Sequence, residues 1–318
     1  MPLDPYESIF QQFPPVSPGD WKNKILADLK GPSPEKLQWH TQDDIEVFPF
    51  YTKEDHKKYH LSIPAKESGT WLITEKVVVD DFASANKIAL EALQMGAHAI
   101  LFDLQKRSCT KPEMEILMKD ILVDMAKIYF ENFGEGNKDF LESMVKGSCP
   151  ERIVLPSNVS AADELATAIR EAFQKGCRFP HFHFYSGTNY FLEIAKLRAC
   201  RWLWKQVCEL NAMPYHLFLF SETETHESKE VNEYDNMLRN TTEAMSAILG
   251  GCDALIINSH DVMHEDTGFG RRMARNIHHI LQYESSFTEI NDAVKGSYYI
   301  EYLTYQLAKK SWEKWPGS

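Results

Sequence analysis

The feature that most constrains this chain is a rhythm of short apolar segments and amphipathic helices that begins at Trp71. Residues 97–104 are apolar almost without interruption, which is typical of a strand covered on both faces. Residues 182–204 repeat the unit with an aromatic strand, a Ser-Gly-Thr-Asn turn and a long helix. Alternation of this kind predicts a parallel sheet with right-handed crossovers.

Seven strands and the helices between them can be placed from this pattern, and an eighth strand near residues 139–147 is left open. The predicted strands are residues 71–79, 97–104, 126–131, 152–155, 182–185, 215–220 and 253–257. The predicted helices are residues 81–95, 113–125, 161–175, 190–204, 233–249, 269–283 and 297–315.

Two architectures satisfy this order of elements. A closed (β/α)8 barrel needs about 250 residues, which residues 71–318 supply. An open doubly wound sheet would carry a glycine-rich nucleotide turn after a strand. The two candidate turns fail, because Gly134 and Gly136 are followed by charged residues and residues 268–270 lack the third glycine. The fold class expected is therefore α/β, a partly degenerate (β/α)8 barrel.

The first 70 residues have a different texture, with recurrent prolines and large aromatic side chains. Residues 18–29 predict a short helix, because apolar residues fall on one side of it. Residues 37–41 and 45–51 flank a Gln-Asp-Asp turn and predict a hairpin. We expect residues 1–70 to form an arm that packs on the main domain or on a partner, the alternative being a partly ordered extension.

Charge and composition exclude several classes of function. The net charge of −12 argues against nucleic acid, because phosphate binding needs a positive surface. The sequence contains no run of about 18 apolar residues, so it predicts no membrane span. The N-terminus lacks the pattern of a signal peptide. The six cysteines are scattered without a C-x-x-C pair, which favours free thiols and a cytoplasmic location.

Candidate ligand-binding residues are the polar groups expected where strands end, because the carboxyl ends of barrel strands carry the chemistry in this architecture. The alternative is that such residues cap the following helices. The candidates at the barrel mouth are Thr74, Ser186, Asn189, Ser221, Thr223 and Asn258.

Two pairs of histidines are candidate metal ligands. His181 and His183 alternate on one face of a strand, but without a nearby carboxylate they favour two interior histidines bonded to neighbours. His260 and His264 lie in an acidic loop and lack the glutamate that zinc proteases place after the first histidine. We therefore expect no metal on this chain. The sequence shows no nucleophile elbow and no phosphate-binding P-loop, so pattern alone indicates an α/β protein and leaves open whether it is an enzyme.

A specific resemblance appears at residues 189–199, which read Asn-Tyr-Phe-Leu-Glu-Ile-Ala-Lys-Leu-Arg-Ala. This run resembles the N-F-F-x-E-x-A-K-L-R-A run of the adenosylcobalamin-dependent acyl-CoA mutases, above all methylmalonyl-CoA mutase. Residues 234–245 resemble that family's Y-N-N-x-x-R-x-x-x-E-A-M helix. The resemblance is strong over about residues 180–315 and weaker over 10–180, where residues 20–39 are similar to the start of the family's small subunits.

The chain departs from the family where catalytic members carry their reactive groups. Those members have a tyrosine after the first strand and a Tyr-His pair after the fifth, and residues 74–76 and 155–158 contain neither. The family's Arg and His in R-T-H-S-Q-T-S-G fall on Phe218 and Phe220. If these phenylalanines point inward, they fill the space through which catalytic barrels thread the CoA tail. No D-x-H-x-x-G segment of a cobalamin-binding domain follows the barrel.

The resemblance therefore implies a small, non-catalytic subunit of a heterodimeric mutase. It implies that a large catalytic subunit is the partner and binds adenosylcobalamin, and that this chain binds no cofactor and no CoA ester. The alternative is a divergent mutase barrel that binds CoA esters and uses a separate cobalamin-binding chain. A metal hydrolase built on His260 and His264 is a third hypothesis.

Overall fold

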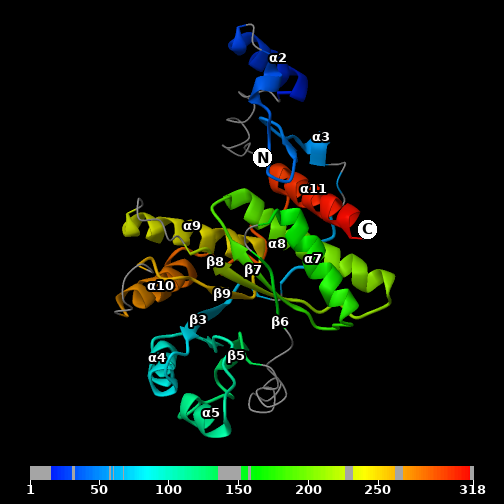
Figure 1. Ribbon diagram of the computed structural model, residues 1–318. Coiled ribbons are helices and arrows are strands. Elements are labelled where there is room, and N and C mark those ends of the chain that lie inside the picture. Colours follow the sequence, from blue (N-terminus) through cyan, green and yellow to red (C-terminus); the bar gives the residue numbers. More distant parts are fainter. Residues whose placement is uncertain are drawn as a thin grey trace, which may run out of the picture.

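A computed structural model describes residues 16–30, 33–56, 59, 61–66, 68–134, 152–156, 159–225, 232–261 and 268–315. Seven parallel strands form one curled sheet in the order β5-β4-β3-β9-β8-β7-β6 (Figure 1). They are β3 (Leu72–Val78), β4 (Ala99–Asp103), β5 (Lys127–Glu131), β6 (Arg152–Val154), β7 (His181–Ser186), β8 (Phe218–Thr223) and β9 (Ala254–Ile256).

The strand order is that of a (β/α)8 barrel interrupted at one place. Each described strand pairs with its neighbour in chain order, and the last strand, β9, pairs with the first, β3. The exception is the step from β5 to β6, which form the two edges of the sheet. The residues 139–147 considered for an eighth strand lie outside the described ranges. The predicted fold class, a partly degenerate barrel, is confirmed.

Helices cover the outer face of the sheet in the order that the sequence predicts. They are α4 (Phe82–Gln94), α5 (Lys111–Leu117), α7 (Ala161–Gln174), α8 (Tyr190–Leu210), α9 (Glu233–Gly250), α10 (Phe269–His279), the π-helical turn η2 (Ile280–Glu284) and α11 (Tyr298–Lys314). None of the described helices combines the length and apolarity needed to cross a bilayer.

Helix α8 continues past its predicted end at residue 204 to Leu210. Two further predicted boundaries are wrong, for local reasons. The helix expected over residues 113–125 ends at Leu117, because Met118 leaves the helical backbone and Asp120 has a φ of 60° in the left-handed region. The strand expected over residues 215–220 lies at Phe218–Thr223 instead. Its neighbour β7 begins at His181, which is paired with Phe218, so the residues before Phe218 have no strand beside them.

The main core lies between the sheet and helices α7, α8, α9 and α11. The apolar side of α8 is fully buried in it: Leu197, Cys200, Trp204 and Val207 are each 0% exposed. A second core fills the space under α4 and α5. A third, smaller cluster lies inside the barrel and determines what the lumen can hold.

The N-terminal residues project from the barrel beside α11 (Figure 1). Helix α2 (Pro18–Leu29) has the predicted bounds and is capped by Ser17, but none of its residues is buried. The predicted hairpin is present as two short antiparallel strands, β1 (Trp39–His40) and β2 (Glu46–Val47). The short helices η1 (Pro34–Leu37) and α3 (Lys53–His56) flank it. Tyr51 joins this region to the barrel by packing 4.9 Å from Tyr302 of α11.

Candidate functional site

Aromatic side chains fill the lower part of the barrel lumen. Side chains alternate along a strand, and in β8 the inward set contains Phe218 and Phe220. Phe220 is 0% exposed and meets Tyr129 of β5 edge to face, with ring centroids 4.8 Å apart. Phe218 stacks on His181 of β7 at 4.7 Å. The two phenylalanines therefore point inward, and rings from opposite sides of the barrel occupy its axis.

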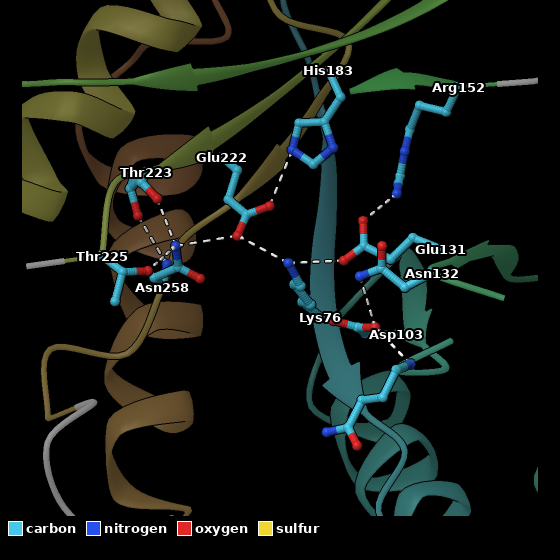
Figure 2. A network of polar contacts seen from close by, with 11 residues as sticks. Lys76, Asp103, Glu131, Asn132, Arg152, His183, Glu222, Thr223, Thr225 and Asn258 are labelled. Atoms are coloured by element: carbon cyan, nitrogen blue, oxygen red, sulfur yellow. Dashed lines mark hydrogen bonds and ion pairs between the residues drawn. The ribbon is translucent and has the colours of Figure 1, made fainter. Parts of the chain in front are cut away.

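A chain of charged side chains lies above this aromatic layer and joins both edges of the sheet (Figure 2). Lys76 of β3 lies 2.8 Å from a carboxylate oxygen of Glu131 and 3.4 Å from one of Glu222. Arg152 on edge strand β6 pairs with Glu131 on edge strand β5 at 2.5 Å. His183 Nε2 lies 3.0 Å from the second oxygen of Glu222.

Each charge in this network is neutralised by a neighbour. Burial opposes ionisation of Glu222, but the hydrogen bond from His183 and the ammonium of Lys76 outweigh it and lower the carboxyl pKa to about 2. Burial lowers the pKa of His183, which is 0% exposed, so at neutral pH the neutral imidazole donates its Nε2 proton to the carboxylate. For Lys76, the two carboxylates outweigh burial and raise the pKa.

The network links edges that no described strand connects. Arg152 also lies over the Phe220 ring at 5.3 Å, so the ion pair rests on the aromatic layer. We interpret the network as a link that holds the two edges of the sheet together and not as a reaction centre, because its charged groups already have partners.

A cavity of about 590 Å³ opens at the mouth, between α4, α10 and the ends of β3 and β9. Asn258 lies on its wall and donates from Nδ2 to the Thr223 carbonyl at 2.5 Å and to Glu222 at 3.3 Å. Glu75 lines the same cavity and pairs with Arg275 at 2.5 Å. Its volume is in the range of small-molecule sites.

The structure separates the six sequence-predicted mouth residues. Thr74 and Asn258 line the cavity. Ser186 and Ser221 lie on the opposite face of their strands, 0% exposed, and their hydroxyl oxygens are 2.6 Å apart. Thr223 also faces the helices and accepts from the Asn258 backbone at 2.9 Å. Asn189 is the N-cap residue of α8, without a side-chain cap.

The expectation that Ser221 and Thr223 follow a strand end is wrong, because β8 runs three residues further than predicted. Both residues are therefore part of a strand, and their side chains point away from the lumen. Ligand binding by the six residues stays a prediction.

The structure favours the structural alternative for the histidines. His181 and His183 lie inside the barrel, stacked near Phe218 and Phe220. No group of three or more potential metal ligands occurs among the described residues. His260 is 4% exposed, between the rings of Tyr234 and Phe269, and His264 lies outside the described ranges.

These side chains do not fit a cobalt ligand of the kind that the family resemblance implies. A histidine that binds a metal has to present an unprotonated ring nitrogen to it. His183 is fully buried beside Glu222, and His260 is enclosed by two aromatic rings. No step of a cobalamin reaction is therefore assigned to the described residues.

The network itself was missed from the sequence, although three of its members follow another inward residue at a spacing of two. Lys76 lies two residues after Thr74, Glu131 two after Tyr129, and Glu222 two after Phe220. The signal available was this period of two, which places each charge on the lumen face once the strand register is known.

Comparison with known proteins supports one family. Residues 172–315 match the family model described as methylmalonyl-CoA mutase. The chain is 30% identical to the methylmalonyl-CoA mutase small subunit of Porphyromonas gingivalis over 391 aligned positions, which cover 96% of this chain and 63% of the relative. It is 39% identical to the methylmalonyl-CoA mutase of Rhizobium meliloti over 155 residues, 45% of this chain and 22% of that protein.

A third relative, the methylmalonyl-CoA mutase of Escherichia coli, is 38% identical over 135 residues, 41% of this chain and 19% of that protein. The chain thus spans less than two thirds of the small subunit and about a fifth of these two mutases. Residues 172–315 belong to the methylmalonyl-CoA mutase family, as the resemblance predicts, and the chain as a whole is similar to the family's small subunit.

Proposed function

We propose that this chain is a non-catalytic structural subunit of a heterodimeric methylmalonyl-CoA mutase. The larger partner would interconvert methylmalonyl-CoA and succinyl-CoA with adenosylcobalamin, in the cytoplasm. The observation that carries the proposal is the filled lumen: Phe218, Phe220 and Tyr129 cross the axis that a threaded CoA tail would need. The name of the relative that covers most of the chain, a small subunit, supports the same role.

Electrostatics at the mouth also disfavour a CoA ester. The cavity is lined by five carboxylates and three basic side chains other than histidine. The carboxylates are Glu75, Asp80, Asp103, Glu222 and Asp261, and the bases are Lys76, Arg271 and Arg275. The phosphate groups of CoA are anionic, and an excess of carboxylates repels them.

The N-terminal region, residues 1–70, is the proposed contact with the large subunit, and residues 71–318 the proposed barrel domain. Helix α2 buries none of its residues, and its Trp21 and Leu26 are 54% and 51% exposed. Leu26 also borders a groove of about 620 Å³ floored by Phe48 and Tyr302. Exposed apolar groups beside a groove are typical of a protein interface.

Co-expression with a large mutase subunit tests this proposal. The expected result is a complex of one copy of each chain after size-exclusion chromatography. Replacing Trp21 and Leu26 by serine should weaken the complex, whereas Leu210→Ser, at a residue 71% exposed at the end of α8, should leave it intact. A chain that stays separate from the large subunit at micromolar concentrations would contradict the proposed role.

A divergent barrel that binds CoA esters itself is the second candidate, and the mouth cavity with Thr74 and Asn258 favours it. Thermal unfolding with and without CoA esters separates the two candidates. A ligand present at a hundred times its dissociation constant stabilises a protein by about 2.7 kcal/mol. The structural role predicts no shift for the isolated chain, and a clear shift would favour the second candidate.

A further inference from the structure

A second buried charge cluster lies outside the lumen, between α7 and α8. The ammonium of Lys196 lies 2.7 Å from Glu164 of α7 and 2.8 Å from Glu193 of its own helix. It also donates to the Tyr185 carbonyl at 2.9 Å. The Lys196 and Glu164 side chains are each 3% exposed, and that of Glu193 is 10% exposed. The ammonium therefore donates to one backbone carbonyl and forms close ion pairs with two carboxylates.

The charges in this cluster do not balance. Two buried carboxylates share one cation here. In the lumen network, by contrast, two cations, Lys76 and Arg152, serve two carboxylates. Glu224, which follows β8, is a third carboxylate on the mouth side of the cluster. Its negative charge repels those of Glu164 and Glu193. Glu243 of α9 accepts from the Glu224 backbone at 3.1 Å, and the buried thiol of Cys200 faces Lys196. Among the described groups, none of these neighbours supplies a second positive charge.

We propose that Glu164 and Glu193 form a proton-binding site, in which one carboxyl group stays protonated near neutral pH and releases its proton as the pH rises. A buried cluster with an uncompensated negative charge is costly, and one bound proton removes that charge. This property is independent of the proposed subunit role.

The site is connected to the turn between β7 and α8. Glu193 accepts a hydrogen bond from the backbone of Gly187, and the Glu224 backbone donates to the Ser186 carbonyl at 3.3 Å. The Glu224 carboxylate lies close to Gly187, about 3.2 Å from where a Cβ would be. Loss of the shared proton would set three carboxylates against each other around this turn, so the turn should open more readily at high pH.

The direction of the pH effect follows from linkage. Burial raises the pKa of Glu164 to about 7 from an ordinary value of 4.5, against the opposing charge of Lys196. The folded state therefore binds more protons than the unfolded state between these values, and stability is lost as pH rises from about 4.5 to about 7. Glutamine at position 164 is neutral at every pH and can still accept from Lys196.

The test compares wild type with Glu164→Gln by urea unfolding at pH 5 and pH 8. The ratio of the two unfolding constants at each pH cancels the contributions of titrating groups outside this cluster, so that it reports the Glu164–Glu193 pair. That ratio should change by at least about tenfold in favour of the variant from pH 5 to pH 8, since each pKa unit is a tenfold factor. Glu171→Gln, on the same helix and 42% exposed, should show no such change.

Two further measurements keep the proposal falsifiable if Glu164→Gln folds poorly. Infrared spectroscopy of the wild type should show a protonated carboxyl band that disappears as the pH is raised through 7. Hydrogen exchange, corrected for intrinsic rates, should show residues 186–193 opening more at pH 8 than at pH 6. A ratio that does not vary with pH, or a wild type without a titrating carboxyl band, would overturn the proposal.

Discussion

Removing the Phe220 ring tests whether the barrel lumen is packed. The side chain is 0% exposed and touches groups from several strands, including Tyr129 at 4.8 Å between ring centroids and Arg152 at 5.3 Å. Truncating a buried phenylalanine to alanine costs about 3–5 kcal/mol. The Arg152 contact adds about 0.5–2 kcal/mol. We therefore expect Phe220→Ala to lower the free energy of unfolding by about 3.5–7 kcal/mol.

Urea unfolding measures this loss as a lower midpoint with an unchanged slope. A loss of this size is a large part of the roughly 5–15 kcal/mol that stabilises a typical domain. Phe179→Ala is the matched control, because Phe179 is 54% exposed and should cost less than about 1 kcal/mol. A cost for Phe220→Ala as small as that of the control would refute the packed lumen, since a ring facing an open channel leaves no cavity behind.

Three further substitutions probe other parts of the structure. Lys76→Met leaves two buried carboxylates short of a cation. Urea unfolding should show a loss of about 3 kcal/mol, which is at the low end for buried pairs because the Lys76 side chain is 22% exposed. Burial lowers the pKa of His278 to about 3. The free energy of unfolding should therefore fall as the pH drops below about 6.5, and His278→Gln should make it less dependent on pH in that range. Gly250→Ala places a Cβ 3.0 Å from Leu197 and should lower the free energy of unfolding by about 1–3 kcal/mol, measured by thermal or urea unfolding. The control is Gly19→Ala on the exposed helix α2, which should change the free energy of unfolding by less than about 0.5 kcal/mol.

The periodicity of the sequence was sufficient to predict the architecture. Each of the seven predicted strands exists, because runs such as residues 97–104 are apolar enough to require burial on both faces. Helix α2 has its predicted bounds because Ser17 and Pro18 form an unambiguous start signal. Local spacing also accounts for the ion pair of Glu193 and Lys196, which are three positions apart on α8 and lie 2.8 Å from each other.

The site could not be predicted to the same depth, since it depends on register and on contacts between distant residues. Moving β8 by three residues transfers Ser221 from the loop to the face opposite the lumen. Arg152 and Glu131 are separated by 21 positions and meet across the two edges of the sheet, which no local pattern shows. Resemblance to a family predicted that Phe218 and Phe220 stand where catalytic members carry Arg and His, but only the structure shows that these two rings fill the lumen beside a charge network.

The number of CoA ester sites in the assembled complex tests the central claim most directly. Equilibrium dialysis of the purified complex of this chain with a large mutase subunit, against a labelled CoA ester, counts these sites. If the lumen of this chain is packed, the complex binds one CoA ester per pair of subunits. Two sites per pair, with the second lost when Asn258 at the mouth of this chain is replaced by leucine, would contradict the account.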